Sequence, residues 1–235
     1  VVFGGLLEYD KNKAKHKLKA HAMDYDVYLK IKNNGPIKKE PYVVFLDEDV
    51  VFHPDRFLFN EPAEIKAEEY YKRLNIFFKK FEAETKLKVK FAMHPKSNFN
   101  NFKSEKYNFD MIQGKTAELV KNSTAVLLHD SSDCTSSVAF AILFEKPVIY
   151  LHFKEFDNFL MRNNINISKK LTGGELIDVD DHKKRIDMNN LTKINKLKYN
   201  KYIDTYIKFP GSPDKELVDI LVDFLDKNFI DLHIK

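Results

Sequence analysis

The stretch from Val126 to Leu151 constrains the fold more than any other part of the chain. An apolar strand is expected at 125–128, a turn rich in hydroxyl groups follows, and residues 138–144 form a short, almost wholly apolar helix. Lys146-Pro147 then leads into a second apolar strand at 147–151. Because this helix has no polar face, it is expected to be buried between the sheet and its neighbours. The order of elements is typical of a parallel sheet covered on both faces.

The same alternation of strand and helix begins near residue 41. Strands are predicted at 42–46 and 89–93, and helices are predicted after Pro62, at 116–122 and after Ser212-Pro213. The first helix follows from apolar residues at helical spacing, which are Ala67, Tyr70, Leu74, Phe77 and Phe81. The last helix is expected to place its apolar residues on one face, namely Leu217, Ile220, Leu221, Phe224 and Leu225. We therefore predict an α/β fold, a Rossmann-like parallel sheet with helices on both faces.

The predicted domain organisation divides the chain at residue 40. Residues 1–40 do not follow the alternation and are interpreted as a connector or the remnant of a preceding domain. Residues 41–235 form the predicted α/β domain. Right-handed crossovers place the turns after residues 46, 93, 128 and 151 at the carboxyl edge of the sheet, where ligands bind in open α/β folds.

Composition excludes several classes of function. The chain has 235 residues, of which 43% are hydrophobic, so it can bury a core, and its net charge of only +4 argues against nucleic-acid binding. No GxGxxG or Walker loop is present, which excludes the usual dinucleotide and P-loop NTPase sites. The histidines lack metal-ligand spacing, so no metal site is expected. A single cysteine, Cys134, fits a reducing cytosol, and no apolar run approaches the roughly 20 residues of a membrane span.

The N-terminal region carries alternating lysines, which are Lys11, Lys13, Lys15, Lys17 and Lys19. A solvated basic segment is the favoured interpretation, and a dedicated anion site is the alternative. The small net positive charge suits a protein that handles anionic small molecules near an anionic membrane.

His94-Pro95 is the first candidate for chemistry, because it directly follows a predicted strand. Proline biases His94 to an extended backbone, which directs the imidazole outward at the sheet edge. There it could donate a hydrogen bond or a positive charge to a phosphate, or protonate a leaving phosphate. The alternative is a histidine that only caps the turn. A second polar turn, described next, makes a functional role the favoured interpretation.

That second turn contains Thr135, Ser136 and Ser137 at the start of the apolar helix. Helix N-termini leave N–H groups unpaired and carry partial positive charge, so hydroxyls and amides there form an anion cradle. Capping by Ser131, Ser132 or Asp133 is the alternative. One capping residue would suffice, however, and six of the seven residues from 131 to 137 can form hydrogen bonds through their side chains.

Three further features remain open. Glu118, near the start of the helix at 116–122, is either a ribose-binding group or an exposed first-turn glutamate. His129-Asp130 is either a further edge pair or part of the turn. The acidic turn Asp47-Glu48-Asp49 is interpreted as a solvated loop rather than a general base or acceptor-binding group.

In order, these motifs resemble the C-terminal, donor-nucleotide domain of GT-B glycosyltransferases, specifically the bacterial families that use CMP-activated sugars. These are sialyltransferases, polysialyltransferases and related enzymes of capsule or lipooligosaccharide synthesis. They share an HP motif and a paired-hydroxyl motif, with a glutamate-bearing helix start between them. The resemblance covers residues 41–151 and rests on Gly114, Glu118, Ser123, His129, Ser136, Phe140-Ala141 and Lys146-Pro147 together with His94-Pro95.

The resemblance implies a role for each matched residue. His94, with Pro95, would contact the CMP phosphate and stabilise the leaving group, and Ser136 and Ser137 would bind the same phosphate, with Thr135-Ser136 as the alternative register. Glu118 would contact the nucleotide. The catalytic base would belong to an N-terminal domain that residues 1–40 do not supply.

The implied protein is a cytoplasmic glycosyltransferase, peripheral to the inner membrane, that transfers sialic acid or a related ulosonic acid from a CMP-sugar to a surface glycan. No metal and no nucleic acid is expected to take part. One alternative is a CDP-glycerol or CDP-ribitol phosphotransferase of the teichoic-acid type. Another is a non-catalytic nucleotide-binding module.

Overall fold

The computed structural model describes residues 1–7, 9–35, 40–53, 58, 63, 65–98, 100, 109–129, 136–156, 167 and 169–229. The chain forms two compact units, one of residues Val1–Gly35 with Lys196–Lys235 and the other of Pro36–Asn195. The sequence-based division placed residues 196–235 in the large domain, whereas in the structure they cluster with the N-terminal segment. Each unit is described separately.

The larger unit is built on six parallel strands, which confirms the predicted fold class. They are β3 (Tyr42–Leu46), β4 (Lys88–Met93), β5 (Asp110–Gln113), β6 (Ala125–His129), β7 (Val148–His152) and β8 (Glu175–Asp178). Their spatial order is β5-β4-β3-β6-β7-β8 and all neighbouring pairs are parallel. Counted from β3, this is the 3-2-1-4-5-6 order of the Rossmann fold, whose topological switch point lies between β3 and β6.

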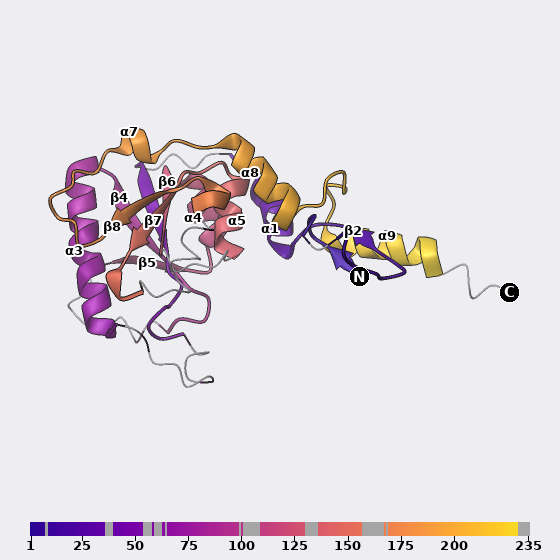
Figure 1. The fold of residues 1–235 in the computed structure, drawn as a ribbon, viewed down its shortest axis with the longest axis horizontal. Helices are drawn as coiled ribbons and strands as arrows, with labels where there is room; N and C mark the ends of the chain where they lie inside the picture. The colour runs from indigo at the N-terminus through magenta and orange to yellow at the C-terminus, as the bar shows by residue number, and fades with distance from the viewer. Residues whose placement is uncertain are drawn as a thin grey trace. The chain divides into compact units, whose positions relative to one another are not determined.

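Helices cover both faces of this sheet (Figure 1). Helix α3 (Ala67–Thr85) lies on one face, and α4 (Thr116–Asn122) and α5 (Ser136–Leu143) lie on the other. A short 3-10 turn, η2 (Lys154–Phe156), follows β7, and the short helix α7 (Met188–Leu191) follows β8. Helix α4 packs against α5, β3 and β4.

Helix α3 is held by an aromatic core. Its buried positions recur at helical spacing and are Tyr70, Tyr71, Leu74, Phe77, Phe78 and Phe81. They pack against alternate residues of the central strands, including Val43 and Phe45 of β3, while the residues between them point to the α4 and α5 face. Every residue of β3 is buried, as expected for a central parallel strand.

The sequence analysis did not predict the two edge strands, β5 and β8. Both are four residues long and only partly buried, so neither has the apolar run that marks the central strands. Strand β8 pairs with β7 and is preceded by Gly174. A Cβ atom at Gly174 would lie 2.6 Å from the Val148 carbonyl oxygen and 2.8 Å from the Tyr150 ring. Only glycine therefore permits this close approach of the two strands.

The smaller unit contains β1 (Val2–Phe3), β2 (Leu18–Lys19), α1 (Met23–Ile31), α8 (Lys196–Tyr202), the π-helical turn η3 (Ile203–Ile207) and α9 (Leu217–Phe229). Its two chain segments are joined by backbone hydrogen bonds, such as that from the Ala22 N–H to the Ile207 carbonyl at 2.7 Å. The Tyr25 hydroxyl also donates to the Asp214 carboxylate at 2.9 Å.

Helix α9 carries the predicted apolar residues at helical spacing along one face, but only part of that face is covered. Ile220 of α9 is buried against Leu18 and Ala20, with Leu217 and Phe224 packed beside it, but Leu221 and Leu225 are exposed. Within the described residues, no helix is long and apolar enough to cross a membrane.

We predict that Gly174→Ala lowers the free energy of unfolding by about 1 to 3 kcal/mol, because the added methyl group forces the β7–β8 backbones apart. Thermal or denaturant unfolding followed by circular dichroism measures this change. Gly35→Ala is the matched control, because a Cβ atom there meets no atom within 4 Å. Equal stability of Gly174→Ala and the wild type would contradict the predicted clash.

Candidate functional site

The turns after β3 and β4 lie side by side at the carboxyl edge of the sheet. The register pairs Leu46 with Ala92, and the Asp47 N–H continues the ladder by donating to the Ala92 carbonyl at 2.9 Å. His94 follows the last residue of β4. The acidic turn and the His94-Pro95 motif therefore belong to one local structure.

Gln113, the last residue of β5, holds the His94-Pro95 turn in place. Its side-chain amide donates to the carbonyl oxygens of His94 at 3.1 Å, Pro95 at 3.2 Å and Ser97 at 3.0 Å. The Ser97 N–H closes the turn by donating to the His94 carbonyl at 3.0 Å. The backbone of the HP motif is thus fixed from the neighbouring strand, and Pro95 itself is exposed.

The imidazole of His94 is half-buried, and its Nδ1 atom accepts a hydrogen bond from the Lys96 N–H at 3.3 Å. In the neutral ring this contact places the proton on Nε2. The His53 ring lies against His94, with 5.1 Å between ring centroids and the planes at 61°. Two histidines therefore face each other at this edge.

The acidic turn after β3 is buried, so its interpretation as a solvated loop is wrong. Asp47 is only 5% exposed and Asp49 only 1%. The Asp49 N–H donates to Asp47 Oδ1 at 3.1 Å. Asp49 also has a φ of 53°, in the left-handed region that non-glycine residues rarely adopt. The sequence could have indicated this location, because parallel pairing of the strands at 42–46 and 89–93 places residues 47–49 beside His94.

Burial changes the protonation of both carboxyl groups. Desolvation, with added repulsion from Asp49, raises the pKa of Asp47 to about 8, although backbone N–H groups of Asp49 and His94 oppose the shift. Desolvation also raises the pKa of Asp49, but the Ser97 hydroxyl and the charges of His94 and His53 act to lower it. Asp47 is therefore protonated at neutral pH, and Asp49 has cationic or polar groups opposite it.

We call Asp47, Asp49, His53, His94 and Ser97 the edge cluster. Three buried polar atoms of this cluster, Asp47 Oδ2, Asp49 Oδ1 and Ser97 Oγ, have no hydrogen-bond partner within the described part of the chain. Ser97 thus lies near enough to Asp49 to influence its pKa without a well-formed hydrogen bond. Unmatched polar atoms and a perturbed carboxyl at a sheet edge are common features of functional sites.

The second predicted turn begins where β6 ends. Thr135, like residues 130–134, lies outside the described residues. Ser136 and Ser137 form the first turn of α5, and only their backbone is described. Because β4 and β6 both flank β3, the HP turn and the start of α5 follow the two strands on either side of the acidic turn.

Glu118 lies in the first turn of α4 and its side chain is exposed. Helix α4 packs against α5, and both helices begin at the carboxyl edge. The described backbone thus brings His94, Pro95, Glu118, Ser136 and Ser137 to the carboxyl edge of the sheet.

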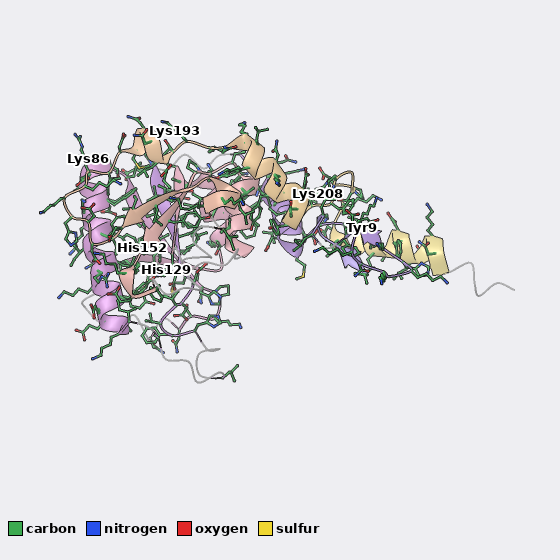
Figure 2. The ribbon with its side chains drawn as sticks, in the orientation of Figure 1. Tyr9, Lys86, His129, His152, Lys193 and Lys208 are labelled. Atoms are coloured by element: carbon green, nitrogen blue, oxygen red, sulfur yellow. The ribbon has the colours of Figure 1, made fainter. Side chains whose placement is uncertain are left out.

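His129 has a different environment from the one proposed for an edge pair. It is fully buried at the end of β6, beside His152 at the end of β7 (Figure 2). Its ring stacks on Phe153 at 5.2 Å and meets Phe156 at 4.5 Å. His129 is therefore part of the aromatic core next to α3, while Asp130 lies outside the described residues.

Two hollows lie away from the edge cluster. The larger, about 480 Å³, is lined by Glu84, Thr85 and residues 185–189 at the C-terminal end of α3, which leads into the amino end of β4. The other, about 190 Å³, lies along β8 and α7. We favour the edge cluster because it combines a buried carboxyl of raised pKa with buried polar atoms that lack a partner among the described residues. Among the described residues, no group of three or more His, Cys, Asp or Glu side chains could hold a metal ion.

We predict that Asp47→Asn removes a pH-dependent loss of stability. Because the folded-state pKa of about 8 exceeds the ordinary value of 3.8, the folded protein binds this proton more tightly than the unfolded chain. Its stabilising contribution is complete below about pH 4 and is lost as the pH rises through about 8.

The stability of Asp47→Asn relative to wild type should therefore rise between pH 5 and pH 9, by at most about 1.4 kcal/mol per pH unit. Denaturant unfolding at pH 5, 7 and 9 measures it. Asp226→Asn, a change at an exposed residue of α9, is the control. Parallel pH profiles for Asp47→Asn and wild type would contradict the buried, protonated state.

Comparison with known proteins adds no evidence on the function of this chain. No protein-family model matches the chain, and no curated protein matches its sequence. Any assignment of function therefore depends on the edge cluster, the start of α5 and the topology that joins them.

Proposed function

We propose that the larger unit binds a CMP-activated sugar, sialic acid or a related ulosonic acid, and that it is the donor-binding part of a glycosyltransferase acting on a surface glycan. One observation carries the proposal: His94-Pro95 and Ser136-Ser137 follow the two strands that flank β3, next to the switch point of a Rossmann-like sheet. Ligands of open α/β sheets bind at this position.

The chemistry of transfer suits these groups. The bond between the anomeric carbon and the phosphate oxygen breaks, the acceptor hydroxyl oxygen forms the new bond, and CMP departs with the bonding electrons. The departing phosphate gains negative charge, which the His94 ring and the N–H groups at the start of α5 are suited to stabilise. In this role His94 is the catalytic residue, Ser136 and Ser137 bind the phosphate, and Glu118 contacts the nucleoside. The proposed reaction draws on no metal.

The acceptor hydroxyl must also lose its proton to a base. The backbone N–H of His94 acts on the Asp47 carboxyl in the turn after β3, but a pKa of about 8 keeps this carboxyl protonated at neutral pH. It is therefore suited to lie beside an anionic phosphate rather than to act as the base. We place the base outside residues 41–235.

Two other functions share these residues. A CDP-glycerol or CDP-ribitol phosphotransferase would also need histidine and serine turns for phosphate, and a non-catalytic module would bind the nucleotide without turnover. Preference for CDP over CMP would distinguish the phosphotransferase from a CMP-sugar enzyme. Absence of turnover would distinguish the non-catalytic module.

Titration calorimetry with CMP, CDP and UDP tests the proposal. We expect CMP to bind best and His94→Ala to weaken its binding about 10- to 100-fold, because a hydrogen bond to a charged group contributes about 1.5 to 3 kcal/mol. His182→Ala, which removes an exposed histidine after β8, is the control and should bind as wild type.

The outcomes are distinct. Absence of CMP binding, or unchanged binding by His94→Ala, would overturn the proposed site. Preference for CDP would favour the phosphotransferase. Binding of CMP by a full-length protein that shows no transfer to any glycan would favour the non-catalytic module.

We also propose that the smaller unit associates with the surface of an anionic membrane. Leu6 is 45% exposed and Leu7 53%, and the exposed lysines Lys11, Lys13, Lys15 and Lys19 follow in the same segment. Tyr9, labelled in Figure 2, lies in the same segment, and the Nζ of Lys17 lies 4.7 Å from the centroid of its ring. Exposed apolar side chains beside lysines suit the interface of an anionic bilayer.

Co-sedimentation with vesicles tests this association. Binding should occur on vesicles with anionic lipid, fall as salt is raised, and be weak on neutral vesicles. Replacing Lys11, Lys13 and Lys15 by Gln should reduce it several-fold, whereas replacing Lys72, Lys79 and Lys86 of the larger unit should not. Equal binding to neutral and anionic vesicles would contradict the proposal.

A further inference from the structure

His21 of the smaller unit is a buried histidine whose two ring nitrogens both have polar contacts. Only 1% of the residue is exposed. Its Nδ1 atom lies 3.0 Å from the Ala22 carbonyl oxygen, and its Nε2 atom lies 2.8 Å from the Lys215 carbonyl oxygen. Both nitrogens therefore face groups that can only accept a hydrogen bond.

A neutral imidazole cannot satisfy both of these contacts. It carries a single N–H group, so in either tautomer the lone pair of the other nitrogen faces a carbonyl oxygen. The imidazolium ion, in contrast, donates from both nitrogens. The Tyr25 N–H also donates to the Ala22 carbonyl, at 3.0 Å, so this oxygen keeps a partner when the ring is neutral. The repulsion between this oxygen and a bare Nδ1 remains, however, and the geometry therefore favours the charged ring.

The carboxylates around His21 also favour a positive charge on the ring. Asp26 of α1 lies closest, with its Oδ1 atom 3.7 Å from Nε2. The Tyr25 ring packs beside the imidazole with 4.9 Å between the centroids, and its hydroxyl donates to the Asp214 carboxylate at 2.9 Å. An anion beside a histidine stabilises the protonated form.

The cations of the neighbouring backbone are paired with carboxylates of the same unit. Lys208 lies opposite His21 across an isolated antiparallel bridge, and its Nζ atom is 3.3 Å from Asp214. The Nζ atom of Lys215 is 2.9 Å from Asp223. Their positive charges are therefore partly balanced and oppose protonation of the ring only weakly.

The contacts of His21 join the two chain segments of the smaller unit. His21 belongs to the N-terminal segment, whereas Lys215 belongs to the C-terminal segment, directly before α9. Asp26 accepts the N–H of Leu217, the first residue of α9, at 2.9 Å. Ile220 of α9 is buried in a small apolar cluster with two residues of the N-terminal segment. Because this cluster is small, the polar contacts at His21 and Asp26 contribute substantially to holding α9.

We propose that His21 is a pH-sensitive contact, in which the imidazolium ion donates to both carbonyl oxygens and holds the C-terminal segment of the smaller unit to its N-terminal segment. Loss of one proton replaces a hydrogen bond by repulsion between a nitrogen lone pair and a carbonyl oxygen, which weakens the attachment of α9. By reciprocity, protonation favours the closed unit as much as closure favours protonation. The attachment is therefore strongest at low pH and weakens as the pH rises through the range in which histidine titrates, about pH 6.5. The contact involves no ligand and does not depend on the nucleotide site.

Amide hydrogen exchange followed by nuclear magnetic resonance tests the attachment. The reporters are the N–H groups of Ala22 and Phe209, which donate across the two segments to the carbonyls of Ile207 and Ala20. Between about pH 6 and about pH 8, we expect their protection, corrected for the intrinsic pH dependence of exchange, to fall about three- to tenfold. One titrating group changes an opening equilibrium by at most about tenfold per pH unit.

His21→Gln removes the titrating ring and should abolish most of this fall in protection. His16→Gln is the matched control, because it removes another histidine of the same segment, and it should retain the pH dependence of the wild type. The N-terminal ammonium group, which donates to the His16 carbonyl and titrates in a similar range, is present in all three proteins and cancels in the comparison. Equal pH dependence in His21→Gln and the wild type would overturn the proposal.

The ring itself provides a second measurement, which decides the matter if His21→Gln does not fold. In the ¹⁵N-labelled wild type, the chemical shifts of the imidazole nitrogens distinguish a protonated nitrogen from a bare one. At about pH 5.5, both nitrogens of His21 should carry a proton, and both protons should exchange slowly with water because the ring is buried. A single protonated nitrogen on His21 in the folded protein at this pH would overturn the proposal.

Discussion

The parallel pairing of β3 with β4 on one side and β6 on the other is the constraint on which the rest of the larger unit depends. Every residue of β3 is buried, and its side chains alternate between the α3 face and the face covered by α4 and α5. Because all the strands run in one direction, their carboxyl ends share one edge. Strand pairing therefore makes the acidic turn and the HP turn neighbours, and α5 follows β6, the strand on the other side of β3.

Electrostatics explains how an acidic turn can lie beside a proposed phosphate site. Burial holds Asp47 protonated at neutral pH and also raises the pKa of Asp49. Two acidic residues thus add much less negative charge than their sequence suggests. The arrangement resembles other sites in which closely spaced groups are driven to different protonation states by their surroundings. His129 shows the opposite case, a histidine whose stacked aromatic neighbours make it part of the core.

Sequence periodicity and composition predicted the elements that are strongly apolar. The strand at 42–46 and the helix at 116–122 have the predicted bounds, and α3 carries its apolar residues at the predicted positions. Strands β5 and β8 were missed because partly exposed edge strands lack a continuous apolar run. The apolar face of α9 was predicted, but the part of it that is buried is determined by contact with Leu18 and Ala20, which are distant in sequence.

The sequence by itself determined the fold class and the location of His94, Glu118, Ser136 and Ser137 at strand ends or helix starts, because these follow from local patterns of apolar and turn residues. Only the tertiary structure decided that Asp47 and Asp49 are buried beside His94, and that residues 196–235 cluster with the N-terminal segment. Burial and charge contacts depend on residues brought together by strand pairing. No local pattern encodes them, because the same acidic turn would be solvated at an unpaired strand end.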